Sequence, residues 1–471
     1  MGNRKKLIHF LRADPVAAAA ALSSPGSFSS NSSVSDDDGY SSSSFPASAA
    51  STPSRYNSPK SPWVHFPGLG ADGSDAAQTT GLIASLVKED GKVYSLAAAG
   101  DVLYTGTDSE NVRVWRDRRE LAVFRTGSGL VKAVVVAGDG RIFTGHQDGK
   151  VRVWRADADD PAVHHRVGSL PALGDFLMSS VNPSSYVETR RGRNRRRAVW
   201  LRHSDAVSCL SLDEAAGLLY SGSWDRTFKV WRVSDSRCLE SVPAHDDAVN
   251  AVVAAGFDGL VFTGSADGTV KVWRREAADP KGDRTRHVVE RVLRKGESAV
   301  TAIAVSPEAR VVYVGSSDGL VTYWRWVNGE AIFGGVLMGH KMAVMCLAVS
   351  GSVVVSGSAD QTLCAWRRDG TEHVLLASLA GHTGPVKCVA VADENDADGE
   401  RRFVVYSGSL DGSVKVWRLS EEPPAAAAER YSLLTTPPRE PHSWDLRPEL
   451  PPTVQSWAPE LAEPCGRLAA A

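Results

Sequence analysis

The middle of the chain alternates short apolar stretches with clusters of turn residues. One unit contains four such stretches, at residues 206–212, 218–223, 227–231 and 238–242, and Gly, Asp and Ser are concentrated between them. Alternation with a period of two residues is typical of β-strands, and the intervening residues favour tight turns. The pattern predicts a four-stranded antiparallel sheet.

The same unit recurs along the chain. Seven frames of eleven residues align without a gap, and SGSWDRTFKVW from Ser221 and TGSADGTVKVW from Thr263 are two of them. The frames end on Trp115, Trp154, Trp231, Trp273, Trp324, Trp366 and Trp417. The period is about 40 residues, which is the length of one four-stranded unit with its turns. One interval, from Trp154 to Trp231, is longer at 77 residues.

The frames carry the residues of an internal hydrogen-bond relay. A buried tryptophan N–H needs an acceptor, and the hydroxyl that begins most frames can provide it. A histidine lies upstream of several frames. A carboxylate in the turn can accept backbone hydrogen bonds and hold two strands in register. Because the histidines recur with the frames, we interpret them as structural rather than catalytic.

These residues resemble those of the WD-repeat (WD40) family, whose members fold as β-propellers with a structural tetrad of His, Ser or Thr, Asp and Trp in each well-formed blade. The resemblance implies an all-β, seven-bladed WD40 β-propeller at residues 79–420. Carried over by position, the complete tetrads are His203, Ser221, Asp225 and Trp231; His245, Thr263, Asp267 and Trp273; His340, Ser356, Asp360 and Trp366; and His382, Ser407, Asp411 and Trp417.

Three blades depart from the tetrad. The first has Glu89 at the histidine position and Ser109 at the aspartate position, and the second has Gly127 in place of histidine. The fifth has Gly296 in place of histidine and Val314 in place of the hydroxyl. We expect these blades to depend more on apolar packing.

An apolar stretch before the first frame predicts how the ring closes. The sequence LIASLVKEDGKVYSL from Leu82 matches LLASLAGHTGPVKCV from Leu375, yet no first three strands precede it. The last unit ends after three strands, at Trp417. Pairing of residues 82–87 with the last blade removes exposed sheet edges. We therefore expect one N-terminal strand to close the ring.

An arginine follows every frame tryptophan: Arg116, Arg155, Arg232, Arg274, Arg325, Arg367 and Arg418. Alternation places each one on the opposite sheet face from its tryptophan. We expect each guanidinium to pair with an acidic or carbonyl group on an adjoining strand or loop. The alternative is a basic ring for an acidic partner. Ubiquitin-ligase substrate receptors of the family often carry Trp-Asp-x-Arg, which no frame here has.

The long interval contains an insertion at about 156–197, which ends in the arginine-rich run RRGRNRRR at 190–197. We place most of it between the third and fourth strands of the second blade, and a position after the fourth strand stays open. The run is expected on a local exposed loop. It fits a solvated loop, a patch for nuclear import or an acidic partner, or a nucleic-acid contact. The candidate binding residues are Arg193, Arg195, Arg196 and Arg197.

Two further features bear on partner recognition. In the family, the residue before the turn aspartate tends to lie on the top rim, and in the third frame it is Trp224. Tryptophan is enriched at binding hot spots, and packing on its own loop is the alternative. The tails at 1–78, rich in Ser, Ala and Pro, and at 421–471, rich in Pro and Ala, are expected to be disordered. In the first tail, Ser58 and Ser61 within SPKSP are candidate phosphorylation sites.

Composition narrows the class of function. The net charge of −2 gives no global attraction to nucleic acid or to membranes. Six cysteines occur without a CxxC pair, which fits a reducing compartment and does not indicate a zinc site. No stretch approaches the roughly 18 apolar residues of a membrane span. We expect no catalytic residue, no metal and no cofactor.

With its uniform Trp-Arg endings, its Ser-rich leader and its insert, the chain resembles plant WD-repeat proteins of the JINGUBANG-like group. The resemblance implies a non-catalytic protein-interaction scaffold or adaptor, monomeric and located in the cytoplasm, the nucleus or both. Nucleic acid is not the expected partner. The alternatives are a nuclear protein that contacts nucleic acid through residues 190–197 and, with less support, a ubiquitin-ligase substrate receptor.

Overall fold

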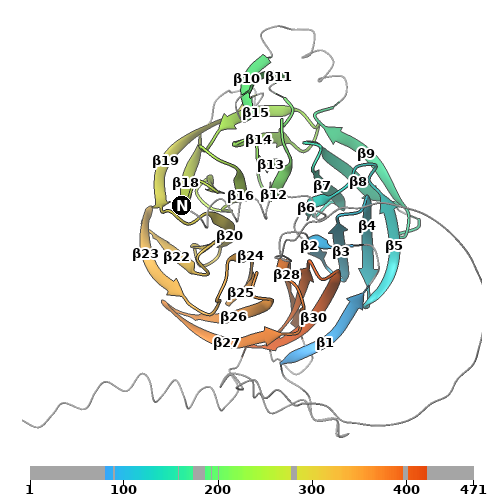
Figure 1. The fold of residues 1–471 in the computed structure, drawn as a ribbon, viewed down its shortest axis with the longest axis vertical. Helices are drawn as coiled ribbons and strands as arrows, with labels where there is room; N and C mark the ends of the chain where they lie inside the picture. The colour runs from blue at the N-terminus through green and yellow to red at the C-terminus, as the bar shows by residue number, and fades with distance from the viewer. Residues whose placement is uncertain are drawn as a thin grey trace, which may run out of the picture. The chain divides into compact units, whose positions relative to one another are not determined.

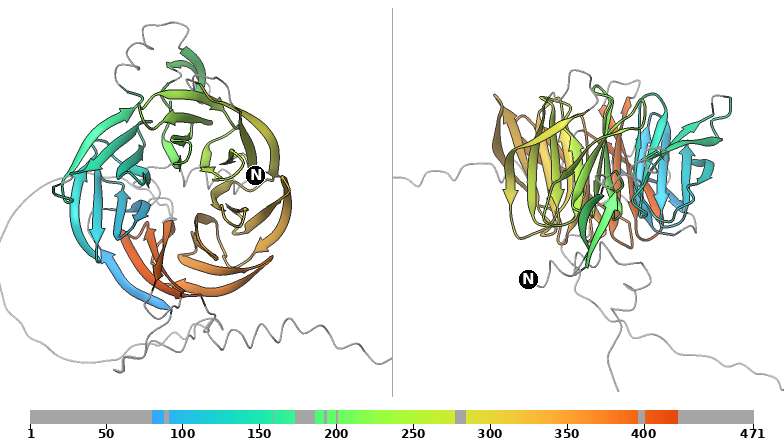
Figure 2. Two further views of the ribbon diagram at one scale, coloured as in Figure 1. Left: turned by 180° about the vertical axis from the view of Figure 1, so that it is seen from behind. Right: turned by 90° about the horizontal axis from the view of Figure 1, so that it is seen from above.

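The computed structural model describes residues 80–87, 91–157, 159–172, 186–191, 194–199, 201–276, 284–395 and 401–421. Seven four-stranded antiparallel sheets are arranged in a ring around a common axis, with the first strand of each sheet innermost (Figure 1). The ring is a flat disc when seen from its edge (Figure 2). The predicted all-β, seven-bladed propeller is therefore confirmed.

The seven sheets are numbered as blades in chain order. Blade 1 contains β2 (Val93–Ala99), β3 (Val102–Thr107), β4 (Asn111–Arg116) and β5 (Arg119–Arg125). Blade 2 contains β6 (Val131–Val136), β7 (Arg141–His146), β8 (Val151–Ala156) and β9 (His164–Leu170). Blade 3 contains β12 (Val207–Asp213), β13 (Leu218–Ser223), β14 (Thr227–Arg232) and β15 (Cys238–Pro243). Blade 4 contains β16 (Val249–Ala254), β17 (Leu260–Ser265), β18 (Thr269–Glu276) and β19 (Arg286–Lys295).

The remaining blades follow the same order from the inside outward. Blade 5 contains β20 (Val300–Ser306), β21 (Val311–Ser316), β22 (Val321–Val327) and β23 (Glu330–Leu337). Blade 6 contains β24 (Val344–Ser350), β25 (Val353–Ser358), β26 (Thr362–Asp369) and β27 (Glu372–Ala380). Blade 7 contains β28 (Val386–Asn395), β29 (Arg401–Ser409), β30 (Ser413–Ser420) and β1 (Gly81–Val87).

Blade 7 is completed by the N-terminal strand. β1 pairs antiparallel with β30, and the register places Leu82 opposite Trp417 and Leu86 opposite Val414. Leu86 is buried in a cluster that also contains Val93 and Trp115 of blade 1. The predicted closure by residues 82–87 is confirmed.

The insertion does not lie where the sequence pattern placed it. β9 pairs with β8 and is the fourth strand of blade 2, so the insertion follows the fourth strand and the placement between the third and fourth strands is wrong. Part of the insertion forms a separate hairpin, β10 (Tyr186–Arg191) with β11 (Asn194–Val199). The outer strand β9 is largely exposed and carries the polar sequence HHRVGSL. An outer strand therefore lacks the apolar alternation that identifies the inner ones.

Adjacent blades interlock through the glycine in each frame. A Cβ atom on Gly264 would lie 2.5 Å from Cγ1 of Val300 in the next blade, and one on Gly408 would lie 2.6 Å from Cγ1 of Val93. The same contact recurs at every blade boundary. The frame requires glycine because the first strand of the next blade occupies the space of a side chain.

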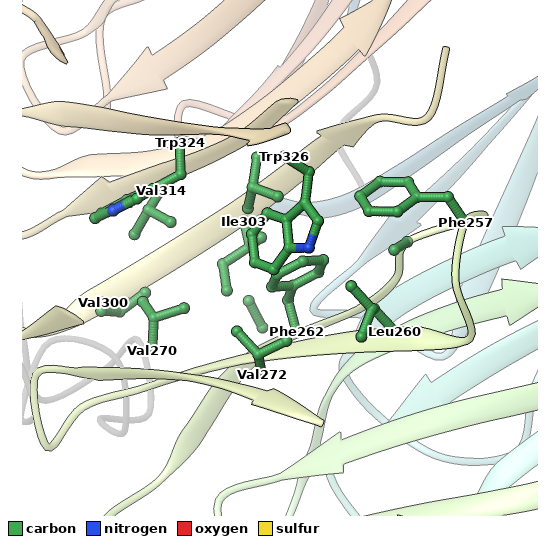
Figure 3. Packing of buried hydrophobic residues seen from close by; sticks show 13 residues of the cluster. Phe257, Leu260, Phe262, Val270, Val272, Val300, Ile303, Val314, Trp324 and Trp326 are labelled. Atoms are coloured by element: carbon green, nitrogen blue, oxygen red, sulfur yellow. The ribbon is translucent and has the colours of Figure 1, made fainter. Parts of the chain in front are cut away.

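The hydrophobic core is divided among the blade boundaries. Figure 3 shows the cluster between blades 4 and 5, where Phe262 and Val272 of one blade meet Ile303 and Trp326 of the next. Every frame tryptophan belongs to a cluster that it shares with the preceding blade. Burial of these rings therefore stabilises contacts between blades as well as within them.

Candidate functional site

The structure brings the four tetrad residues of blade 3 together. The indole Nε1 of Trp231 donates to Ser221 Oγ at 2.9 Å, and Ser221 Oγ lies 2.8 Å from His203 Nε2. His203 Nδ1 lies 2.9 Å from Asp225 Oδ2. Since Ser221 accepts from the indole, it can donate to Nε2, and Nδ1 then donates to the carboxylate. Both imidazole nitrogens are engaged inside the blade.

The same arrangement recurs in blades 4 and 7, and blade 6 repeats its contacts of histidine with the hydroxyl and the aspartate. In blade 4, Thr263 Oγ1 lies 2.8 Å from Trp273 Nε1 and 2.7 Å from His245 Nε2, and His245 Nδ1 lies 3.1 Å from Asp267 Oδ2. In blade 7 the distances along Trp417, Ser407, His382 and Asp411 are 2.8, 2.8 and 2.9 Å. In blade 6 His340 lies 2.6 Å from Ser356 and 3.2 Å from Asp360, and Trp366 is edge-on to the imidazole with ring centroids 6.3 Å apart.

A hydroxyl two residues after the turn aspartate is a further member of the relay that sequence reasoning missed. Thr227 Oγ1 donates to Asp225 Oδ1 at 2.7 Å and lies 3.2 Å from His203 Nδ1. Equivalent contacts are made by Thr269, Thr362 and Ser413. The signal was in the sequence, because Asp-x-Thr or Asp-x-Ser occurs in the four complete frames and in none of the other three.

The turn carboxylates are held ionised by these contacts. Burial opposes ionisation of Asp411, but hydrogen bonds from Ser413, the Thr383 amide and His382 outweigh it and lower the pKa of its carboxyl to about 2. For Asp225, burial likewise opposes ionisation, and His203, Lys229 and Thr227 lower its pKa below the ordinary value. A lowered pKa means that the carboxylates stabilise the fold at neutral pH and that this contribution is lost in strong acid.

In blade 2, a histidine at a different position provides the imidazole that the tetrad lacks. His146 lies at the end of β7, and its Nε2 is 2.8 Å from Thr144 Oγ1, which accepts from Trp154 Nε1 at 3.0 Å. Burial, assisted by the nearby Arg152 charge, lowers the pKa of His146 to about 3, so the imidazole is neutral at physiological pH. Blade 2 has Gly127 at the position of the tetrad histidine, and His146 supplies the imidazole of the relay instead.

Arginines pair with the turn aspartates in blades 2 and 5. Arg152 Nη2 lies 2.8 Å from Asp148 Oδ2, and Arg294 Nη2 lies 3.3 Å from Asp318 Oδ2. These are the two blades with glycine at the histidine position. These blades were expected to depend more on apolar packing, and the structure adds that charge-assisted hydrogen bonds replace those of the histidine in both.

Blade 1 keeps part of the relay, and Glu89 lies outside the described residues. Trp115 Nε1 donates to Thr105 Oγ1 at 3.0 Å. Ser109 Oγ contacts Thr107 Oγ1 at 2.7 Å and accepts from the Asn111 amide. In blade 5, Val314 supplies no acceptor, and Trp324 packs instead in the cluster with blade 4.

We expect His146→Ala to destabilise the propeller by about 1–3 kcal/mol, because the Thr144 hydroxyl loses a buried partner. The free energy of unfolding from chemical denaturation measures the effect. His165→Ala is the control, since that imidazole is exposed on β9. An equal, small effect of both substitutions would show that His146 does not replace the missing tetrad histidine.

Six of the seven arginines that follow the frame tryptophans pair with carboxylate or carbonyl groups, as expected. The partners and distances are Asp101 for Arg116 (2.9 Å), Asp139 for Arg155 (3.8 Å), Asp235 for Arg232 (3.1 Å), Glu290 for Arg274 (2.7 Å), the Glu421 carbonyl for Arg367 (3.0 Å) and Glu394 for Arg418 (3.1 Å). Arg325 makes no such pairing among the described residues, and its buried Nε has no hydrogen-bond partner there. Local pairing therefore weakens the idea of a basic ring.

Trp224 lies in a cluster built from three consecutive blades. It occupies the turn between β13 and β14 and packs half-buried against Ala248, Ala266 and Ala299. The Nζ atom of Lys132 on the inner strand β6 lies 4.1 Å from the centroid of the Trp224 ring and 5.7 Å from that of Tyr94 on β2. We call Tyr94, Lys132 and Trp224 the aromatic–lysine cluster. The indole is not packed on its own loop alone.

The arginine-rich run forms strands where a loop was expected. The β10–β11 register places Glu188 opposite Arg197, Thr189 opposite Arg196 and Arg190 opposite Arg195. Arg193, and the side chains of the whole run, lie outside the described residues. Ser58 and Ser61 also lie outside them.

Among the residues that the structure describes, no group of three or more His, Cys, Asp or Glu side chains is arranged to hold a metal ion. Within the same residues, no helix is long and apolar enough to cross a membrane.

Comparison with known proteins agrees with this geometry. The repeat pattern described as "WD domain, G-beta repeat" matches residues 119–155, 195–232, 236–274, 289–325, 333–367 and 373–418. WD repeat-containing protein pop1 of Schizosaccharomyces pombe is 26% identical over 189 residues, which cover 34% of this chain and 22% of the relative. The alignment thus spans less than a quarter of that protein's length.

The WD40 β-propeller domain of Doa1 superposes with a TM-score of 0.53 at 20% identity, covering 74% of this chain and 99% of that domain. This likeness concerns the fold. The six sequence matches each end on the arginine after a frame tryptophan, in blades 2 to 7. The chain therefore belongs to the WD40-repeat β-propeller family.

Proposed function

We propose that this protein is a non-catalytic scaffold or adaptor that binds protein partners through the aromatic–lysine cluster. WD40 propellers are generally protein-interaction scaffolds and typically non-catalytic. The observation that carries the proposal is the half-buried Trp224, which lies between the alanines of blades 4 and 5 on one side and Lys132 of blade 2 on the other. Aromatic side chains held in one conformation lose little entropy on binding and are frequent hot spots.

The tetrad histidines support a structural role rather than catalysis. In blades 3, 4 and 7, each imidazole uses one nitrogen for a Ser or Thr hydroxyl and the other for an aspartate. A general base must have a nitrogen available to the substrate. These groups therefore serve the fold, and recognition is assigned to residues on the surface.

Within the family, we propose that the protein is a plant regulatory WD-repeat protein of the JINGUBANG-like group, monomeric and acting in the cytoplasm, the nucleus or both. The uniform Trp-Arg endings support this assignment. The β10–β11 hairpin is a second candidate surface, through Arg195, Arg196 and Arg197. Its backbone register sets Arg190 opposite Arg195 and Thr189 opposite Arg196, so several arginines of the run belong to one hairpin. Binding to nucleic acid that falls steeply with salt and requires these arginines would favour the alternative of a nuclear protein that contacts nucleic acid.

We expect Trp224→Ala to reduce partner binding by about thirtyfold, the effect of losing a hot spot of about 2 kcal/mol. Partners are captured on the full-length protein from native tissue, identified by mass spectrometry, and titrated individually against both forms. Val167→Ala is the control, because Val167 is an exposed apolar residue on β9 of blade 2. Equal affinities for the wild type and Trp224→Ala, with unchanged melting, would contradict the role of the cluster.

A further inference from the structure

Among the described outer strands, that of blade 5 carries the largest number of exposed large apolar side chains. β23 is the outermost strand of its sheet and lies on the rim between β19 and β27 (Figure 1). Among the described residues, no strand pairs with its outer edge. An unpaired edge presents backbone N–H and C=O groups that another chain can bind.

β23 lacks the charges that usually protect such an edge. The seven residues after Glu330 read AIFGGVL. By contrast, the neighbouring outer strand β19 reads RHVVERVLRK, and β5 reads RELAVFR. Charged side chains on an edge strand disfavour pairing with another strand, so β23 is the less protected of these edges.

Large apolar side chains are exposed along the same strand. The exposed fractions are 43% for Ile332, 56% for Phe333, 40% for Val336 and 74% for Met338, which directly follows the strand. Phe333 and Val336 pair with Trp324 and Thr322 on one face of the sheet, whereas Ile332 pairs with Arg325 on the other face. We call Phe333, Val336 and Met338 the apolar strip. Phe333 packs edge-on against Trp324 with ring centroids 5.6 Å apart, so part of the strip is held in place by the core. Exposed apolar side chains gathered in one place are typical of a binding surface.

Two glycines, Gly334 and Gly335, lie in the middle of the strip and carry no side chain. A Cβ atom on Gly334 would lie 2.1 Å from Cε2 of Tyr323, because the tyrosine ring covers that side of the strand. Gly335 has φ of +145°, which β-carbon-bearing residues rarely adopt. The glycines therefore make room for the Tyr323 ring on that side of the strand.

The charges near the strip favour an acidic partner. Glu330 at the start of β23 is already paired with Arg291 of β19 at 2.7 Å. Lys295 at the end of β19 and Lys341 in the loop after the strip are both exposed. Glu297 is also exposed and lies two residues from Lys295, so Lys341 is the positive charge that remains at the end nearer Met338.

We propose that the edge of β23 binds an extended segment of a partner protein as an added strand. The segment has apolar side chains at alternate positions, which pack on the apolar strip, and an acidic residue at the end that lies by Lys341. Main-chain hydrogen bonds to β23 provide affinity, and the apolar and acidic side chains provide specificity. This surface is separate from the aromatic–lysine cluster. An experiment can therefore refute binding at one surface without bearing on binding at the other.

A phage library of short random peptides, selected on the full-length protein, tests the proposal. We expect the enriched peptides to share alternating apolar residues with at least one Asp or Glu. Their affinity should fall by at least about tenfold for the double variant Phe333→Lys, Val336→Lys, because charge on the edge opposes strand addition. Val167→Lys is the matched control, as an equally exposed apolar residue on the outer strand β9, and should leave binding unchanged.

A second measurement does not depend on any variant folding correctly. A synthetic copy of an enriched peptide, methylated at consecutive backbone nitrogens, should lose binding to the wild-type protein, because the N–H donors that face β23 are then removed in either register. Equal binding of the methylated peptide, or no enrichment at all, would overturn the proposal. So would a dimer, measured by light scattering, that the double variant dissociates, since the occupant of the edge would then be a second copy of the chain.

Discussion

Deletion of residues 1–90 is expected to open the ring and make the protein aggregate, whereas deletion of residues 1–75 leaves it folded. The longer deletion removes β1, so β30 becomes an unpaired edge and Leu86 leaves the cluster that joins blades 7 and 1. Exposed strand edges pair readily with other chains. Light scattering and thermal melting of the two truncated proteins measure the effect.

The shorter deletion is the control, because it ends before Gly81, where β1 begins. Equal solubility and equal melting temperatures for both truncations would show that blade 7 does not need its fourth strand. A charged substitution at Leu86 would provide an intermediate case, since this side chain is buried while the strand itself remains.

Trp231→Ala is expected to lower the free energy of unfolding by about 3–5 kcal/mol, as for other buried aromatic side chains that are truncated. Trp231 is 1% exposed and packs against Phe143 and Val153 of blade 2. The truncation also leaves the Ser221 hydroxyl without its indole donor. Chemical denaturation of the purified protein measures the change.

Two matched variants separate packing from hydrogen bonding. Trp231→Phe retains most of the ring but removes the donor, so it should cost less than the alanine variant. Trp224→Ala truncates a half-buried tryptophan seven residues earlier and should leave stability nearly unchanged. A Trp231→Ala protein with wild-type stability would contradict the structural role of the tetrad.

The sequence predicted the fold well because the inner three strands of every blade follow one rule. Each frame begins beside a glycine that admits the next blade and ends on a tryptophan that packs against the previous one. The fourth strands obey no such rule, since they lie on the outer rim. For this reason β9, with exposed His165 and Arg166, was missed, and the insertion was placed before it.

The contacts within the relays were predictable only where the residues occupy repeating positions. His203 could be assigned to Asp225 because the same spacing recurs in blade 4. His146 could not be assigned, because it reaches Thr144 from two residues away on the same strand rather than from an upstream loop. A side chain at a different sequence position can take the place of the tetrad histidine if the fold brings it close enough. A comparison of equivalent positions in the repeats cannot detect such a replacement. Likewise, Arg294 of blade 4 reaches the turn aspartate Asp318 of the adjacent blade 5, and their sequence positions do not indicate this pairing.

Closure of the ring by β1 also sets the order of events during synthesis. Lys415 of β30 contacts Ser85 of β1 across 330 residues of chain. At about 5–20 residues per second, a ribosome needs roughly 17–70 s to make that length. For most of this time β1 is outside the ribosome without the strand that it pairs with, while the blades are made one after another. The first strand of the propeller to be made is thus the last to be paired, and it depends on chaperones or on its short length to avoid other partners in the interval.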